Sequence, residues 1–494
     1  MRECGMLLPV SSLSSKYGIG AFSKEAYEFL DQLQRAGQKY WQILPLGPTG
    51  YGDSPYQSFS AFAGNPYFID LTELIKEGLL TEEECDSTDF GGDSRYIDYE
   101  KLYHNRFPLL KKAYARWKEG GHTSAEAMES LGEETKLYCF YMALKDHFQG
   151  KSWIEWEEDI RLRNPEAVVR YEKELEGEIG FYVFLQMKFT EEWNRLKSYA
   201  GDRGIGIIGD MPIYVAFDSA DTWSHPELFQ FDEDRNPIAV AGCPPDGFSP
   251  TGQLWGNPLY RWGYHKETGY EWWKKRMEYS FLLYDVVRVD HFRGFDEYYS
   301  IPAGSENAIG GAWEKGPGID FFEEMKKAFG ELDIIAEDLG FLTPSVKNLL
   351  KETGYPGMKV LEFAFNSWEE SDYLPHNHTQ NSVVYTGTHD NDTLKSWYYS
   401  LSQEDRRFAD NYMNTTNPSE EQVSWNYIRL ALQSVARLAI IPVQDYLGLG
   451  CEARINEPST LGKNWRFRLL PGEVTEDILN KCRELTFLYG RGKE

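Results

Sequence analysis

Three carboxylates in the second half of this 494-residue chain each come directly or shortly after a short apolar run. Asp290 follows Val-Val-Arg-Val, Glu337 follows Ile-Ile-Ala, and Asp390 comes shortly after Val-Val-Tyr. Such runs, rich in β-branched residues, are typical of buried strands. Because side chains at the C-terminal ends of parallel strands meet on one face of a barrel, we expect the three carboxylates to lie close together.

The other apolar runs predict the same kind of fold. They alternate with helical patterns, which indicates an α/β protein, a (β/α)8 TIM barrel with large insertions between barrel strands. Helices are predicted at 22–36, with Ser23 as N-cap, at 321–329 and at 344–351. The eight predicted strands are 5–9, 40–46, 206–214, a fourth ending at Asp290, a fifth ending at Glu337, 359–364, a seventh ending at Thr388, and 439–443.

Two connections are much longer than the others. Residues from about 66 to 204 are rich in Glu, Lys and Leu, which predicts a mostly helical insertion between strands 2 and 3. Residues from about 216 to 280 predict a loop-rich insertion between strands 3 and 4. Since barrels carry insertions on the loops around their active face, we expect one domain spanning 1–494.

Composition narrows the possible partners and the compartment. The net charge of −27 argues against nucleic acid and anionic membrane surfaces as partners. The six cysteines are scattered without a CxxC pair, which favours reduced thiols in the cytoplasm. The N-terminal apolar run is too short for a signal peptide, and no run is long enough to span a membrane.

Two carboxylates on either side of one bond are the groups that cleave glycosides, and a third can stabilise the cationic transition state. Arg288 lies two residues before Asp290, so the two share a strand face, and the arginine would keep that carboxylate ionised as a nucleophile requires. The alternative is that Arg288 and Asp290 form an ion pair at the strand end with a purely structural role. Burial and a neighbouring carboxylate would raise the pKa of Glu337, which suits a general acid. The alternative for Glu337 is a helix cap or a solvated loop residue.

At the third carboxylate, His389 could donate to a sugar hydroxyl and Asp390 could accept from two. A capping network for the next helix is the alternative, and we assign Asp392 to it. Metal catalysis is disfavoured because His376 and His378 lie in a polar loop before the seventh strand. A phosphate-binding loop and a G-x-S-x-G serine motif are both lacking. We therefore expect neither a metal nor a cofactor.

These motifs, in this order, resemble the α-amylase superfamily of retaining glycosidases. Longer segments resemble the 4-α-glucanotransferase family (amylomaltase or disproportionating enzyme), and the likeness runs from Leu7 to Arg466, weakest at about 75–200. The segments that carry it are 41–56 (Trp-Gln-Ile-Leu-Pro-Leu-Gly-Pro-Thr-Gly-Tyr-Gly-Asp-Ser-Pro-Tyr), 60–66, 209–214, 241–246 and 252–258.

The resemblance implies a role for each matching residue. Asp290 would be the nucleophile, Glu337 the acid and then the base, and Asp390 the residue that stabilises the oxocarbenium-like state. The donor subsite would comprise Arg288, His291, His389 and Asp210, with Tyr56 stacking on the sugar and Ser54 nearby. The acceptor side, the rest of the chain-binding surface and a second glucan site would comprise Asp246, Phe248, Gln253, Trp255, Asn257, Asn464 and Tyr51.

The activity implied by the resemblance is that of a glycosyltransferase of carbohydrate metabolism. It would transfer a segment of a 1,4-α-D-glucan to the 4-hydroxyl of an acceptor glucan or glucose by a retaining double displacement. Its partners would be maltooligosaccharides, longer α-1,4-glucans and glucose as acceptor. An α-glucan hydrolase of the same superfamily is the alternative that the motif set disfavours. A non-catalytic glucan-binding barrel would have lost carboxylates that are all present here.

Overall fold

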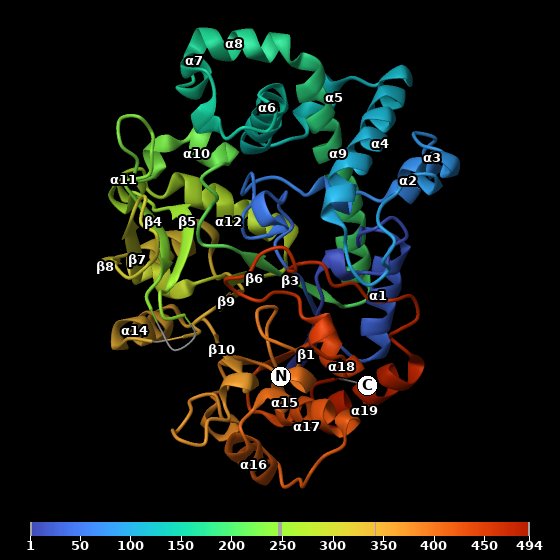
Figure 1. Ribbon diagram of the computed structural model, residues 1–494, viewed down its shortest axis with the longest axis vertical. Helices are drawn as coiled ribbons and strands as arrows, with labels where there is room; N and C mark the ends of the chain where they lie inside the picture. Colours follow the sequence, from blue (N-terminus) through green and yellow to red (C-terminus); the bar gives the residue numbers. More distant parts are fainter. Residues whose placement is uncertain (1, 246–248, 341, 493–494) are drawn as a thin grey trace.

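A closed barrel of parallel strands forms the centre of the computed structural model, which describes residues 2–245, 249–340 and 342–492 (Figure 1). Among these residues eight strands close the barrel in the order β1-β12-β11-β10-β9-β6-β3-β2, which confirms the predicted (β/α)8 fold. The barrel strands are β1 (Glu3–Leu7), β2 (Tyr40–Gln42), β3 (Gly206–Met211), β6 (Val286–Val289), β9 (Ile334–Ala336), β10 (Gly357–Val360), β11 (Ser382–Tyr385) and β12 (Leu438–Pro442).

The two-residue alternation of each strand decides which side chains enter the barrel. Val286 of β6 and Ile335 of β9 belong to the apolar cluster inside the barrel, whereas Val287 belongs to the cluster between barrel and helices. Residues two further along a strand share its face. Arg288 and Asp290 therefore follow Val286 into the barrel, and Glu337 follows Ile335. The C-terminal ends of the strands, called the barrel mouth below, thus collect these polar groups.

Most helices surround the barrel. They include α1 (Lys24–Arg35), α13 (Ile319–Phe329), α14 (Pro344–Thr353), α15 (Leu394–Ser400), α16 (Gln403–Tyr412), α17 (Glu420–Gln433), α18 (Val443–Leu447) and α19 (Glu476–Leu488). Ser23 occupies the N-cap position of α1, but its hydroxyl bonds to the Glu25 side chain at 2.5 Å rather than to the helix backbone. None of the helices within the described ranges combines the length and apolar character needed to cross a membrane.

The connection between β2 and β3 contains a group of helices at one end of the molecule, at the top of Figure 1. The last of them, α9, returns to the barrel, where its Trp193 indole donates to the Leu283 carbonyl at 3.1 Å. The helices are α2 (Leu71–Lys76), α3 (Glu82–Asp86), α4 (Tyr99–Glu119), α5 (Ser124–Glu129), α6 (Glu133–His147), α7 (Glu158–Arg161), α8 (Pro165–Glu174) and α9 (Glu176–Asp202).

A second sheet lies beside the barrel, and the sequence patterns did not predict it. Its strands pair antiparallel in the order β5-β4-β7-β8: β4 (Ala239–Cys243), β5 (Gln253–Pro258), β7 (Glu297–Pro302) and β8 (Ala312–Lys315). The connection after β3 supplies two of these strands, together with α10 (Ala220–Ser224), α11 (Trp262–Glu267) and α12 (Glu271–Leu283). The segment from 216 to 280 is therefore less loop-rich than expected.

Several barrel strands end earlier than predicted, and β2 and β10 show why. β2 stops at Gln42, although the Ile43 amide still donates to the Ile208 carbonyl at 2.9 Å. β10 stops at Val360, and the chain then turns into a short 3-10 helix, η7 (Leu361–Phe363). In both cases the apolar run continues beyond the strand, because residues at the barrel mouth remain buried after the ladder hydrogen bonds have ended.

Candidate active site

Backbone hydrogen bonds at the barrel mouth place two of the three carboxylates beside each other. In the parallel pairing of β6 with β9, Val289 lies opposite Ala336. The next residues are Asp290 and Glu337, and the Glu337 amide donates to the Val289 carbonyl at 3.1 Å. The Asp290 amide donates to the Met211 carbonyl at 3.0 Å, which ties β6 to β3. The positions of both carboxylates are thus set by the rigid barrel rather than by a loop.

Arg288 connects Asp290 to a second, deeper carboxylate. Its Nη1 donates to both oxygens of Asp210 at 2.8 Å and to Oδ1 of Asp290 at 3.2 Å. The Asp210 side chain is 0% exposed, whereas that of Asp290 is 28% exposed. Asp290 can therefore meet a substrate, and Asp210 cannot without a rearrangement. Arg288 and Tyr56 occupy its oxygens, and the place of Asp210 in the donor subsite stays a prediction.

Glu337 accepts a backbone hydrogen bond on each of its oxygens. The His291 amide donates to Oε2 and the Leu339 amide to Oε1, both at 2.8 Å. Burial raises the pKa of Glu337, while Arg288 and these two amides oppose the rise. Burial also raises the pKa of Asp290, well above its usual value; Arg288 opposes this rise without cancelling it, and Asp210 and Glu337 reinforce it. Burial of two carboxyls side by side favours the retention of one proton between them.

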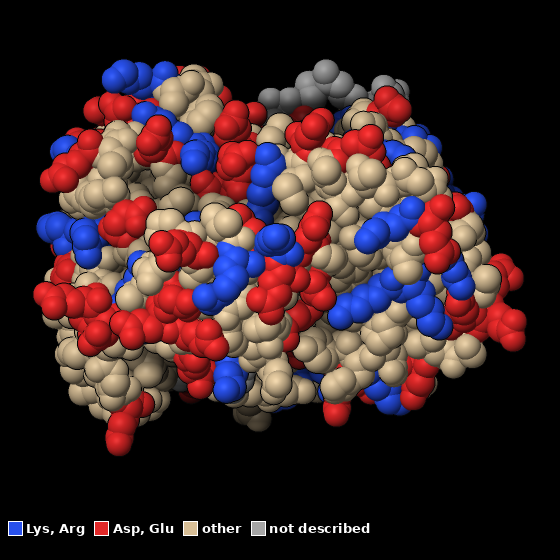
Figure 2. Space-filling model, turned by 90° about the horizontal axis from the view of Figure 1, so that it is seen from above, with Lys and Arg blue, Asp and Glu red and all other residues tan. Residues whose placement is uncertain are grey.

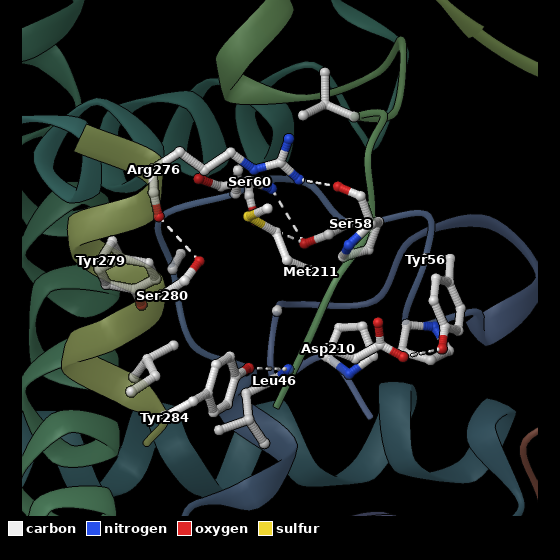
Figure 3. A pocket seen from close by; sticks show the side chains of 18 of the residues that line it. Leu46, Tyr56, Ser58, Ser60, Asp210, Met211, Arg276, Tyr279, Ser280 and Tyr284 are labelled. Atoms are coloured by element: carbon white, nitrogen blue, oxygen red, sulfur yellow. Dashed lines mark hydrogen bonds between the residues drawn. The ribbon is translucent and has the colours of Figure 1, made fainter. Parts of the chain in front are cut away.

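Tyr56 joins Asp210 to the third strand-end motif. Its hydroxyl donates to Oδ2 of Asp210 at 2.7 Å (Figure 3). The same hydroxyl lies 2.9 Å from Nε2 of His389. Since a hydroxyl has a single proton, Nε2 of His389 must be the donor in the second bond. The two rings also stack, with centroids 5.2 Å apart at 18°. Burial lowers the pKa of His389, so a neutral imidazole protonated on Nε2 is consistent with the geometry.

Asp390 is held by two residues that follow β12 in the chain. The Asn456 amide donates to its Oδ1 at 2.6 Å, and Arg454 donates to its backbone carbonyl at 2.9 Å. The Asp390 side chain is 45% exposed, which leaves it accessible from solvent. The sequence reasoning missed both Asn456 and Arg454. Their signal is the polar pair shortly after the eighth barrel strand, where loop residues reach the barrel mouth.

His291 lies immediately after Asp290 with φ at 51°, a left-handed conformation that is uncommon for a non-glycine residue. The edge contact between the Trp255 and His291 rings has a centroid distance of 4.9 Å, and the Trp255 indole donates to Gln253 at 3.0 Å. Nε2 of His291 is buried without a hydrogen-bond partner among the described residues. Burial lowers the pKa of His291 to about 3, so its imidazole is neutral.

Three predicted binding residues use their side chains within the protein. Asn257 accepts from the Gln57 side chain at 3.1 Å and donates to the Val215 carbonyl at 2.9 Å. Asn464 donates to the Thr460 carbonyl at 2.8 Å, and Ser54 accepts from the Tyr56 amide at 3.2 Å. Their contact with a bound glucan stays a prediction. Asp246 and Phe248 lie outside the described residues, as does the side chain of Tyr51.

A cavity of about 60 Å³ lies behind Asp210 and Tyr56, and Arg276 and Tyr284 line its far side (Figure 3). Its size suits a few water molecules. Arg276 donates to the Ile213 carbonyl at 3.0 Å and so supports the chain just after β3. No group of three or more His, Cys, Asp or Glu side chains suited to a metal ion occurs in the ranges that the structure describes.

A (β/α)8 barrel with paired carboxylates, a third carboxylate and aromatic rings at its mouth defines an enzyme of glycosidic bonds. Comparison with known proteins narrows this class. The profile of the 4-alpha-glucanotransferase family matches residues 8–473. The 4-alpha-glucanotransferase of Clostridium butyricum is 47% identical over 98% of this chain and 99% of its own. That of Thermus thermophilus is 46% identical over 96% of each chain.

Among solved structures, the amylomaltase of Streptococcus agalactiae, determined in complex with acarbose, superposes with a TM-score of 0.97. It is 40% identical and covers 100% of both chains. The chain belongs to the 4-α-glucanotransferase family, whose members transfer segments of α-1,4-glucans.

Proposed function

We propose that the enzyme transfers α-1,4-glucan segments to the 4-hydroxyl of a glucan or of glucose with retention of configuration. Asp290 is the nucleophile, Glu337 the acid and base, and Asp390 the residue that stabilises the transition state. The observation that carries these roles is the unequal bonding of the adjacent carboxyls. Asp290 contacts the Arg288 guanidinium at 3.2 Å, whereas among the described residues the hydrogen bonds of Glu337 come from neutral backbone amides.

A charged donor favours ionisation of a carboxyl more strongly than a neutral donor does. We assign the proton of the pair to Glu337 and the free carboxylate to Asp290, because the Arg288 guanidinium bonds to Asp290 directly. This is the protonation state that a retaining mechanism needs before its first step.

In the first step an oxygen of Asp290 attacks the anomeric carbon of the donor. The bond from that carbon to the glycosidic oxygen breaks, and Glu337 gives its proton to the leaving oxygen. In the second step Glu337 takes the proton of the acceptor 4-hydroxyl. The acceptor oxygen then attacks the anomeric carbon and releases Asp290, so two inversions give net retention.

The other residues of the barrel mouth bind and orient the sugar in this proposal. Asp390 presents its exposed carboxylate to sugar hydroxyls, and Tyr56 supplies an aromatic face beside it. Asp210 acts from behind by holding Arg288 and Tyr56 in place. His291 belongs to the donor subsite in this proposal, and its ring contacts Trp255; its neutral imidazole can bond a sugar hydroxyl.

The substrates proposed are maltooligosaccharides and longer α-1,4-glucans, with glucose as the smallest acceptor. The acarbose complex of the Streptococcus agalactiae amylomaltase supports this choice, because that relative matches the chain over its full length. We also propose a cytoplasmic enzyme without nucleic acid or membrane partners. The six free cysteines support the compartment. The excess of Asp and Glu supports the lack of polyanionic partners, and on the face in Figure 2 basic residues lie among acidic ones.

Incubation of the purified protein with maltotriose alone tests the proposed function. Transfer produces glucose and longer maltooligosaccharides while the number of reducing ends stays constant. Hydrolysis raises the number of reducing ends and yields shorter products only. We expect a ladder of products at constant reducing ends. Rising reducing ends without longer products would indicate a hydrolase, and unchanged maltotriose would refute the proposal.

A further inference from the structure

Two buried carboxyls lie beneath the segment 386–394, which carries His389 and Asp390 from the end of β11 to the start of α15. Glu362 belongs to η7, after β10, and Asp445 belongs to α18, after β12. They are 7% and 2% exposed, so neither reaches the open side of the barrel mouth. The mechanism above uses neither of them, and both pack against the segment from below.

Asp445 holds the segment at both ends. Its Oδ2 accepts from the Thr386 hydroxyl at 2.7 Å, and its Oδ1 accepts from the Leu394 amide at 2.9 Å. One carboxyl therefore fixes the distance between the last residues of β11 and the first residue of α15. Burial raises the pKa of Asp445 to about 7, although both hydrogen bonds oppose the rise.

Glu362 lies under the middle of the segment. Its backbone amide donates to the Thr386 carbonyl at 3.2 Å. Its carboxyl fills the space beside Gly387, where an added Cβ would lie 2.7 Å from Oε1 of Glu362 and 3.2 Å from Cβ of Asn391. The Glu362 carboxyl is thus packed against both Gly387 and Asn391, with no room for a side chain at position 387.

A short series of hydrogen bonds leads from Asn391 to Asp390. Oδ1 of Asn391 accepts from the Thr388 amide at 2.9 Å and from the Thr388 hydroxyl at 2.8 Å. The Thr388 hydroxyl in turn accepts from the Asp390 amide at 3.2 Å. A shift of Asn391 would therefore move the turn that orients the Asp390 carboxylate and the His389 ring.

The surroundings of Glu362 are poorly suited to a negative charge. Burial raises its pKa well above the usual value, and Asp445 and Asp392 reinforce the rise. Asn391 and Arg454 oppose it, and the buried phenol of Tyr427 faces it from α17. Within the described ranges Oε1 of Glu362 has no hydrogen-bond partner. An ionised carboxylate in this position would be desolvated next to two further acids.

We propose that Glu362 in its uncharged form is a positioning residue for Asp390 and His389, with Asp445 as the second anchor of the segment that carries them. The inference rests on the role proposed for Asp390. When Glu362 loses its proton, repulsion from Asp445 and Asp392 displaces Asn391 and the turn above it. Turnover then falls at alkaline pH for a reason separate from the loss of the Glu337 proton.

The test compares wild type with Glu362→Gln and Glu362→Ala in kcat on maltotriose across acidic to alkaline pH. Glutamine has the shape of the uncharged acid and never ionises. We expect Glu362→Gln to retain kcat within about twofold at acidic pH. At alkaline pH the fall of kcat should begin about one pH unit higher than in wild type. Glu362→Ala should lower kcat by about 10²-fold, because small displacements of groups at the reacting centre cost that much.

Glu192 of α9 offers a matched control. It is also a buried carboxyl, 2% exposed, and burial raises its pKa. Its side chain accepts from the Asp70 amide at 2.7 Å, and it belongs to a helix of the connection between β2 and β3 rather than to a segment that follows a barrel strand. Glu192→Gln should leave the alkaline limb of kcat unchanged. The proposal is overturned if the limb of Glu362→Gln coincides with that of wild type, or if Glu362→Gln is as inactive as Glu362→Ala.

Unfolding measurements separate this proposal from the proposed function. An acid whose folded pKa is raised loses stability as pH rises above its unfolded value, so Glu362→Gln should become more stable than wild type with rising pH. The gain is expected whether or not the protein acts on maltotriose. Inactive wild type would refute the proposed function alone, whereas absence of the stability gain would refute an uncharged Glu362.

Discussion

The hydroxyl of Tyr56 is a single atom whose removal tests how the barrel mouth is organised. It donates to Oδ2 of Asp210 at 2.7 Å and accepts from Nε2 of His389 at 2.9 Å. Tyr56→Phe leaves the ring and its stacking in place. It deprives a fully buried carboxylate of a donor. Among the described residues, Asp390 at 3.4 Å then remains as the polar partner of the His389 ring.

A hydrogen bond to a charged group contributes about 1.5–3 kcal/mol. If this hydrogen-bond energy is lost from the transition state, kcat/KM on maltotriose falls by about 10- to 150-fold, since each 1.4 kcal/mol corresponds to about tenfold. Kinetics of glucose release from maltotriose, with unfolding midpoints in denaturant measured in parallel, give both the catalytic and the structural effect.

Tyr446 provides the matched control, because its buried hydroxyl has no hydrogen-bond partner among the described residues. Tyr446→Phe should leave kcat/KM unchanged and cost no stability. The reasoning would be refuted if Tyr56→Phe lost stability but kept kcat/KM within a factor of about two, because the hydroxyl would then serve folding and not the site.

Three further outcomes are expected. Asp290→Asn should lower kcat by about 10⁴-fold or more while calorimetry still detects maltooligosaccharide binding; unchanged turnover would exclude Asp290 as nucleophile. Asn456→Ala removes the 2.6 Å bond to Asp390 and should lower kcat/KM about tenfold, and an effect on KM alone would contradict a transition-state role. Burial lowers the pKa of His225, but Glu134 and Glu227 together raise it to about 9. The stability from these contacts is complete below the unfolded pKa of about 6.5 and is lost as pH rises through 9, by about 3 kcal/mol relative to His225→Gln. Parallel pH dependence of unfolding in the two proteins would contradict this.

Strand-end chemistry could be predicted from the sequence because it depends on local periodicity. Val286, Arg288 and Asp290 share one strand face, and the same two-residue step places Glu337 beyond Ile335. Backbone hydrogen bonds between β6 and β9 then bring the two strand ends together, and this pairing does not depend on which side chains follow the strands. The resemblance to a known family agreed with this interpretation over nearly the whole chain.

Features that depend on pairing between distant segments could not be predicted in this way. β4 and β7 lie in different connections, so neither apolar run indicated its partner. The burial of Asp210 results from Arg288 and Tyr56 closing over it, and a motif match cannot show this. Asn456 lies on the loop after β12, and only the folded barrel reveals that its amide reaches Asp390.

Trapping of a covalent intermediate tests the central claim most directly. Glu337→Gln, treated with α-maltotriosyl fluoride, can form the glycosyl-enzyme because fluoride leaves without a proton, but it lacks the base that activates the acceptor. Mass spectrometry of a tryptic digest should find maltotriosyl on the peptide Val289–Arg293, and specifically on Asp290. Release of fluoride with the label on another residue, or without any label, would contradict the assignment of Asp290 and Glu337.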